Sequence, residues 1–165
     1  MNSNYIIRPE TEKDYETVEN LTRDSFWIVY TPGCTEHYVL NQFRTNPDFI
    51  PELSLVLELD GKIIGHVMYC WSKINVDDGS QIKMMTFGPI SIHPDFKRKG
   101  YGKILLDYSM EKAKQMGAGC LLICGNSDFY GKSGFVVASS KGFAMPMTLK
   151  VMLHIFCARN WKKAF

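Results

Sequence analysis

The residues best suited to chemistry lie in a basic turn between an apolar segment, Phe87–Ile92, and an amphipathic one that follows Gly102. Three consecutive cations open the turn: Lys97, Arg98 and Lys99. Gly100 and Gly102 lack a Cβ, so the backbone can fold its N–H groups around an anion, and the start of the next helix adds its positive dipole end. These residue types in this order predict a phosphate-binding turn between a strand and a helix.

Three kinds of phosphate ligand fit the sequence poorly. A nucleoside triphosphate needs the phosphate-loop pattern, but five residues separate Gly125 from Gly131 where that pattern has four. A nicotinamide dinucleotide needs a third glycine where Leu105 stands. Nucleic acid needs a wider basic face or an aromatic platform around Lys97–Lys99, so no nucleic-acid partner is expected.

Two blocks of sequence resemble the GNAT acyltransferase superfamily. Lys97–Gly102 is similar to its acetyl-CoA signature: arginine or glutamine, two residues, glycine, one residue, then glycine or alanine. Asp128–Phe135 is similar to the family's tyrosine-containing helix that ends in Gly-Phe. The resemblance runs from about Leu53 to Phe135, and Leu53–Gly61 with Ile64–His66 also resembles a large bacterial branch of mostly uncharacterised members. The lysine at the first signature position can meet a phosphate as a point charge but cannot copy a planar bidentate contact.

The resemblance implies a single α/β domain over residues 1–165, with a mixed sheet that splays at the cosubstrate strand and helices on both faces. It also implies acetyl-CoA as cosubstrate, with its pantetheine arm along Ile90–Ile92 and its pyrophosphate on the N–H groups from Arg98 to Lys103. The expected cosubstrate-binding residues are Ile90, Ser91, Ile92, Lys97, Arg98, Lys99, Gly100, Tyr101, Gly102, Lys103, Asn126 and Tyr130.

Acyl transfer from a thioester to an amine needs an oxyanion donor, an acid for the leaving thiolate and a base for the amine. The resemblance assigns the first role to the backbone N–H of Ile90. It assigns the second to Tyr130, because a phenol with a pKa of about 10 is protonated at neutral pH. The base stays unassigned: it is one of Glu52, Glu58, His66 and His93, or a base that works through water. Of these, His66 is expected in the core, whereas His93 suits a turn cap and a chemical role equally.

The predicted activity is therefore direct acetyl transfer to a primary amine of a small molecule or peptide. Four aromatic residues could line the acceptor pocket, although ordinary core positions suit them as well: Phe26, Trp27, Tyr30 and Tyr38. The missing base and Lys97 motivate an alternative: a non-catalytic sensor or structural protein of the same fold that binds CoA or acyl-CoA.

Composition sets the wider limits. The chain has 165 residues, 45% hydrophobic and 22% charged, which suits one globular domain, and its net charge of +2 gives no reason to expect an anionic membrane. Neither a run of about 20 apolar residues nor an apolar signal core occurs, so a cytoplasmic protein is expected. Five scattered cysteines predict reduced thiols, mostly in the core, and Cys120 and Cys124 lie too far apart on a strand to chelate a metal together.

Hydrophobic periodicity places these residues on alternating elements. Helices are expected over Tyr15–Leu21, Glu36–Phe43 and from Gly102 to Met116, with a short one within Gly125–Gly134. Strands are expected over Tyr5–Arg8, Leu53–Leu59, Lys62–Trp71, Gln81–Ile92, Cys120–Cys124, Phe135–Ala138 and Thr148–Phe156. Asp60-Gly61 is a two-residue hairpin signal. Exposed edges in the C-terminal strands would permit a homodimer.

Overall fold

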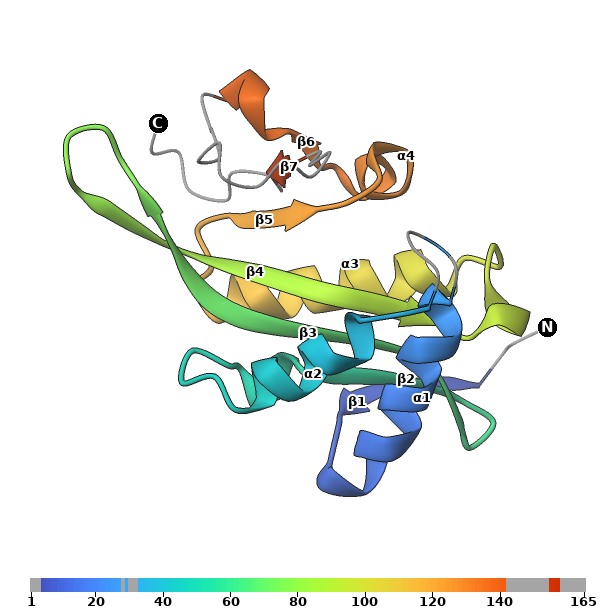
Figure 1. Ribbon diagram of the computed structural model, residues 1–165. Coiled ribbons are helices and arrows are strands. Elements are labelled where there is room, and N and C mark those ends of the chain that lie inside the picture. Colours follow the sequence, from blue (N-terminus) through green and yellow to red (C-terminus); the bar gives the residue numbers. More distant parts are fainter. Residues whose placement is uncertain (1–3, 28, 30–32, 142–154, 158–165) are drawn as a thin grey trace.

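A computed structural model describes residues 4–27, 29, 33–141 and 155–157. Seven strands form one mixed sheet in the order β1-β2-β3-β4-β5-β7-β6 (Figure 1). The strands are β1 (Tyr5–Pro9), β2 (Leu55–Leu59), β3 (Lys62–Asn75), β4 (Gln81–Ile92), β5 (Leu121–Cys124), β6 (Val136–Val137) and β7 (Ile155–Cys157). The helices are α1 (Tyr15–Phe26), α2 (Glu36–Arg44), α3 (Tyr101–Gln115) and α4 (Ser127–Tyr130).

Local sequence explains the antiparallel half of the sheet, in which β1 to β4 pair in succession. Asp60 and Gly61 both have positive φ angles, 48° and 77°, as a tight hairpin that matches the strand twist requires. β3 and β4 form a long hairpin that extends beyond the rest of the sheet (Figure 1). The helix α3 then crosses over so that β5 lies parallel to β4.

The two faces of the sheet bury different side chains, because successive residues of a strand point to opposite faces. On the α3 face, Val67 and Phe87 pack with Leu105 and Leu106 in the main core. On the other face, Val56 and Met68 pack with Val18 of α1 and Leu40 of α2. The expected α/β fold with helices on both faces is confirmed.

β4 and β5 pair over only two residues each among the described positions, Met85 with Leu121 and Thr86 with Leu122. β4 runs on to Ile92 without β5 beside it, so the expected splay occurs here. A bulge after Val67 shifts the register between β3 and β4 near the same point.

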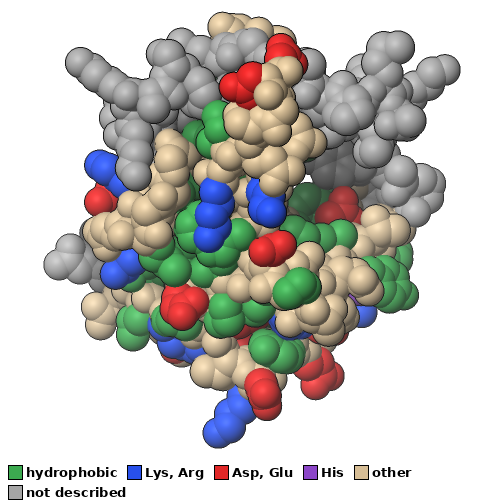
Figure 2. All heavy atoms as spheres, turned by 90° about the vertical axis from the view of Figure 1, so that its left-hand side faces the viewer, with side chains coloured by type: hydrophobic (Ala, Val, Ile, Leu, Met, Phe, Trp, Pro, Cys, Tyr) green, Lys and Arg blue, Asp and Glu red, His purple; other side chains and the backbone are tan. Residues whose placement is uncertain are grey.

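Three other expectations concern composition. Among the described residues, Cys34, Cys70, Cys120 and Cys124 form no disulfide, although Cys124 is exposed and Cys34 half-buried. Within the described residues, no group of His, Cys, Asp or Glu is arranged to hold a metal, and no helix is long and apolar enough to cross a membrane. Figure 2 shows basic and acidic side chains interspersed with hydrophobic ones on one face. Most of the strand expected over Thr148–Phe156 lies outside the described residues.

Candidate functional site

The exposed edge of β4 presents backbone groups that β3 does not use. The N–H of His93 donates to the carbonyl of Ile64 at 2.8 Å, so these two form a hydrogen-bonded pair. Antiparallel pairs alternate along the ladder, and Ile92 and Ile90 therefore direct their N–H and C=O groups away from β3. Ser91, between them, directs its backbone groups toward His66. Within the segment expected to bind the pantetheine arm, Ile90 and Ile92 thus offer backbone N–H donors on the side where β5 has diverged.

The turn after β4 brings further N–H groups to the same end of the sheet. Arg98 and Gly100 have positive φ angles, 61° and 91°, and α3 begins directly afterwards at Tyr101. The first N–H groups of a helix have no partner inside it. A Cβ on Gly102 would lie 3.3 Å from the ring of Phe129, so this glycine lets α3 approach the segment around α4. The backbone from Arg98 to Lys103 therefore has the form of an anion-binding turn.

Tyr130 lies at the end of α4 beside the point where β4 and β5 part. The side chain of Asn126, expected to contact the cosubstrate, caps α4 by accepting from the N–H of Asp128 at 2.8 Å. The Tyr130 ring is buried and meets Phe87 of β4 edge-on, with 5.9 Å between centroids. The loop and α4 thus place the predicted acid against the predicted thioester strand.

A buried pair of hydroxyls lies in the same core, and sequence reasoning missed it. Tyr69 of β3 and Ser109 of α3 are fully buried and lie 2.8 Å apart through their hydroxyl oxygens. Ser109 donates to the carbonyl of Leu106, so it accepts from Tyr69. Burial raises the pKa of Tyr69, which keeps this phenol protonated. The available signal was a serine on the apolar face of the predicted helix.

Two cations of the turn are held by protein groups. The ammonium of Lys97, expected to meet a phosphate, donates to the backbone carbonyl of Ser25 at 2.6 Å. Lys103 forms an ion pair with Asp107, which also accepts from Ser133 at 2.7 Å. Arg98 and Lys99 are exposed beside them.

Three of the four candidate bases have structural contacts. His66 is buried, with Nε2 3.2 Å from Ser54 Oγ, as expected of a core histidine. His93 Nδ1 accepts from the N–H of Asp95 at 3.3 Å and caps the turn, which is one of the two roles that the sequence left open for it. Glu58 accepts from Arg8 at 3.1 Å. Glu52 is exposed in a short 3-10 turn.

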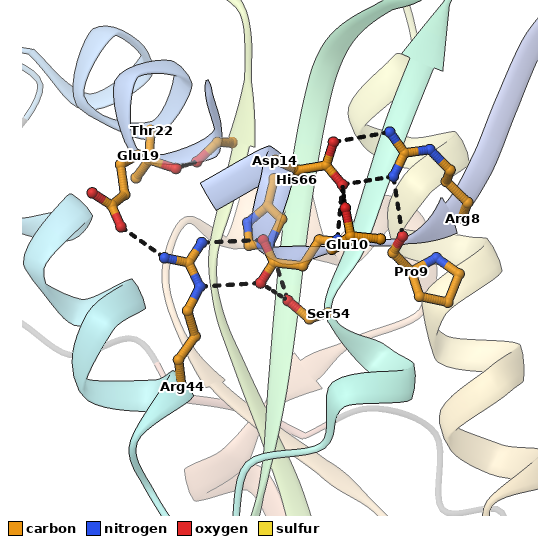
Figure 3. Close-up of polar contacts among 11 residues, drawn as sticks. Arg8, Pro9, Glu10, Asp14, Glu19, Thr22, Arg44, Ser54 and His66 are labelled. Atoms are coloured by element: carbon orange, nitrogen blue, oxygen red, sulfur yellow. Dashed lines mark hydrogen bonds and ion pairs between the residues drawn. The ribbon is translucent and has the colours of Figure 1, made fainter. Parts of the chain in front are cut away.

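His66 belongs to a buried ionic cluster that joins α1, α2 and the end of β1 to the sheet (Figure 3). The Glu10 carboxylate lies 3.4 Å from His66 Nε2 through Oε2 and accepts from the Ser54 hydroxyl at 2.6 Å. It also forms a bidentate ion pair with Arg44. Burial opposes ionisation of Glu10, but the bonds from His66, Arg44 and Ser54 outweigh it and lower its pKa to about 2. The carboxylate therefore stays charged, and its low pKa makes it a weak proton acceptor at neutral pH.

The candidate acceptor residues are divided between core and surface. Phe26, the last residue of α1, is half-buried, whereas Trp27 and Tyr38 are 55% and 64% exposed. Tyr30 lies outside the described residues. The two exposed aromatic side chains lie at the end of α1 and near the start of α2. Their exposure leaves them free to contact an acceptor molecule.

Comparison with known proteins identifies relatives of this arrangement. A family model described as an acetyltransferase (GNAT) domain matches residues 6–138. The chain is 27% identical over 97 residues to the "Uncharacterized N-acetyltransferase YjhQ" of Escherichia coli (strain K12), covering 58% of this chain and 53% of that protein. The matched region thus spans about half the length of this curated relative.

Two solved structures share the fold. A GNAT family acetyltransferase from Brucella melitensis in complex with acetyl-CoA has a TM-score of 0.75 at 21% identity, covering 94% of this chain and 88% of that one. The GNAT family N-acetyltransferase YhbS from Escherichia coli in complex with CoA has a TM-score of 0.79 at 19% identity, covering 96% and 83%. At such identities, structural likeness establishes the fold alone.

Proposed function

Because the chain belongs to the acetyltransferase (GNAT) domain family, we propose that it transfers the acetyl group of acetyl-CoA to a primary amine of a small molecule or peptide. The observation that carries this proposal is the edge of β4 beyond Thr86, which no described strand pairs and where Ile90 and Ile92 direct backbone N–H groups away from β3. That edge leads directly into the turn that ends at the start of α3. A linear ligand with a phosphate at one end and a thioester at the other suits such an edge.

The chain's own groups supply two of the chemical roles. The N–H of Ile90 donates to the thioester oxygen as this oxygen gains negative charge. The amine nitrogen forms its bond to the acetyl carbon, the carbon–sulfur bond breaks, and the phenol of Tyr130 gives its proton to the leaving thiolate. The proton lost by the amine goes to water or to the exposed Glu52, because Glu58, His66 and His93 are held in structural contacts.

The test measures acceptor-dependent release of free CoA thiol from acetyl-CoA across a panel of primary amines. Tyr130→Phe should lower kcat by about 10² or more, the usual contribution of a general acid, while CoA binding persists. Tyr108→Phe is the matched control, since Tyr108 is exposed on the outer side of α3. Wild-type turnover by Tyr130→Phe would remove the acid role from Tyr130.

A second function, a non-catalytic CoA-binding sensor, is favoured by the structural contacts of the candidate bases. It is distinguished by thermal stabilisation with acetyl-CoA in the absence of turnover with any amine. Turnover with one amine rejects the sensor, and a lack of stabilisation by both acetyl-CoA and CoA rejects both functions.

A further inference from the structure

Three hydrogen bonds join the C-terminal half of α1 to the two parts of the predicted cosubstrate-binding region, the end of β4 and the signature turn. The hydroxyls of Thr22 and Ser91 lie 2.9 Å apart. Ser25 Oγ donates to the carbonyl of Ile92 at 2.7 Å. Lys97, the first residue of the signature turn, donates to the carbonyl of Ser25 at 2.6 Å. Ser25 thus contacts the end of β4 with its side chain and the signature turn with its backbone.

These polar contacts occur at a buried interface where apolar packing alone could hold α1 against the sheet. Thr22 and Ser91 are fully buried, and Ser25 is 5% exposed. A buried hydroxyl without a hydrogen-bond partner is unfavourable, so each must find one. Apolar side chains would seal α1 against the sheet without that requirement, but they would not fix direction. Hydrogen bonds define which atoms meet, and here they select Ser91 and Ile92.

The Ser25 hydroxyl binds directly to the edge of β4 that is directed away from β3. The carbonyl of Ile92 is one of the groups directed away from β3, and Ser25 is its hydrogen-bond donor. This bond holds the peptide group that follows Ile92, and with it the entry to the turn. The Ser25 carbonyl lies in the last turn of α1, where carbonyls lack helical partners and a cation is favourable. Lys97 supplies that cation.

We propose that Thr22, Ser25 and Lys97 form a clamp, here called the α1 clamp, which positions the cosubstrate-binding edge of β4. In this clamp Lys97 raises cosubstrate affinity through Ser25 and Ile92 and not by contacting a phosphate. The inference rests on the proposed function, because the edge matters only if CoA binds there. It assigns no reacting atom to these residues, which are positioning residues.

A double-mutant cycle on CoA affinity tests the order of these contacts. Lys97→Met keeps the apolar stem and removes the ammonium, and Ser25→Ala removes the bond to Ile92. Each should raise the Kd for CoA about fivefold, the effect of one hydrogen bond. Because the two contacts act in series, the double variant should also lose only about five- to tenfold in affinity for CoA. Independent contacts would instead multiply to about 25-fold, which would overturn the clamp.

Salt dependence and rescue separate positioning from charge. A lysine that contacts a phosphate contributes less as salt screens it, so Lys97→Met would then flatten the dependence of Kd on ionic strength. The clamp predicts an unchanged slope, and recovery of affinity in Lys97→Arg. Lys114→Met, an exposed lysine on α3, is the matched control. A flattened slope, a failed rescue or unchanged affinity in Lys97→Met overturns the inference while CoA still binds the wild type. A wild type that does not bind CoA overturns the proposed function as well.

Discussion

Gly125 allows the ring of Tyr130 to lie directly against the backbone after β5. A Cβ at this position would be 2.3 Å from Cε2 of Tyr130, whereas carbon atoms in contact lie about 3.5–4.0 Å apart. The ring cannot retreat freely, because Phe87, Phe129 and Phe135 surround it. The glycine is therefore needed for the position of the predicted acid.

Gly125→Ala should consequently displace Tyr130 and impair both folding and chemistry. We expect a loss of about 1–3 kcal/mol in the free energy of unfolding, as for overpacked cores. Acetyl-CoA turnover should fall at least ~10-fold, because the acid is misplaced. Chemical denaturation and steady-state kinetics measure the two effects. Gly119→Ala is the control, since its Cβ would meet nothing within 4 Å. Equal behaviour of the two variants would show that the ring does not need Gly125.

Glu10 links stability to pH. Its pKa of about 2 lies below its ordinary value of 4.5, so the folded protein holds the carboxylate more tightly in its charged form than the unfolded chain does. The resulting stabilisation is complete above about pH 4.5 and is lost as the pH falls toward 2. Asp14, whose pKa the Arg8 guanidinium also lowers, adds a loss in the same acid range.

Glu10→Gln isolates the contribution of Glu10, because Asp14 affects wild type and variant alike. At pH 7 we expect the variant to be less stable by about 1–3 kcal/mol, since the buried Arg44 loses the charge of Glu10 and keeps only its ion pair with Glu19. The difference should narrow as the pH falls from 4.5 to 2, where the wild-type carboxyl also becomes neutral. Denaturant unfolding across this range measures it, with exposed Glu52→Gln as the control. A difference that is constant with pH would contradict the assignment.

At the residue scale, the sequence predicts whether a side chain is buried more readily than it predicts its hydrogen-bond partner. Sequence reasoning predicted that His66 belongs to the core and named a turn cap as one of two roles for His93, because both conclusions follow from neighbouring residues. It missed the contacts of Thr22 and Ser25, which lie on the inner face of α1 but bond to residues 69 and 67 positions away. Local periodicity shows that such hydroxyls are buried and says nothing about which atoms they meet.

At the scale of elements, β4 was predictable in extent but not in register. Its bounds, Gln81–Ile92, match the expected strand, and the Asp60-Gly61 hairpin has the positive φ angles that its sequence demands. The bulge after Val67 leaves no comparable signal, since it depends on how β3 and β4 meet. That register decides which amides of β4 face the open edge, so it decides the site.

The register predicts an alternating pattern of amide hydrogen exchange along the end of β4. The N–H of Ser91 is directed to β3 and should exchange slowly, whereas those of Ile90 and Ile92 should exchange at least about tenfold faster. Saturating CoA should slow Ile90 and Ile92 and leave Ser91 nearly unchanged. Residue-resolved NMR exchange with and without CoA measures this. Uniform protection without CoA would mean that another group covers the edge, and fast exchange with CoA would place the ligand elsewhere.

At the scale of the whole molecule, Phe87 connects two parts of the sheet that share few backbone bonds. Only two residue pairs join β4 to β5 among the described positions, so side chains must hold β5 and α4 in place. The Phe87 ring, 2% exposed, stacks on Tyr69 at 5.0 Å and meets Tyr130 and Phe135 edge-on, each at 5.9 Å. One ring thus contacts β3, α4 and Phe135, the residue before β6.

Phe87→Ala should therefore loosen β5 and α4 from the rest of the sheet in addition to lowering stability. We expect a loss of about 3–5 kcal/mol, as for other buried phenylalanines, and earlier exchange in peptides from β5 and α4 than in those from β2 and β3. Hydrogen-exchange mass spectrometry at increasing denaturant resolves these regions. Phe43→Ala, which removes a ring from the core on the opposite face, should weaken the protein without separating the two parts. Simultaneous opening of both regions in Phe87→Ala would show that α3 alone unites the sheet.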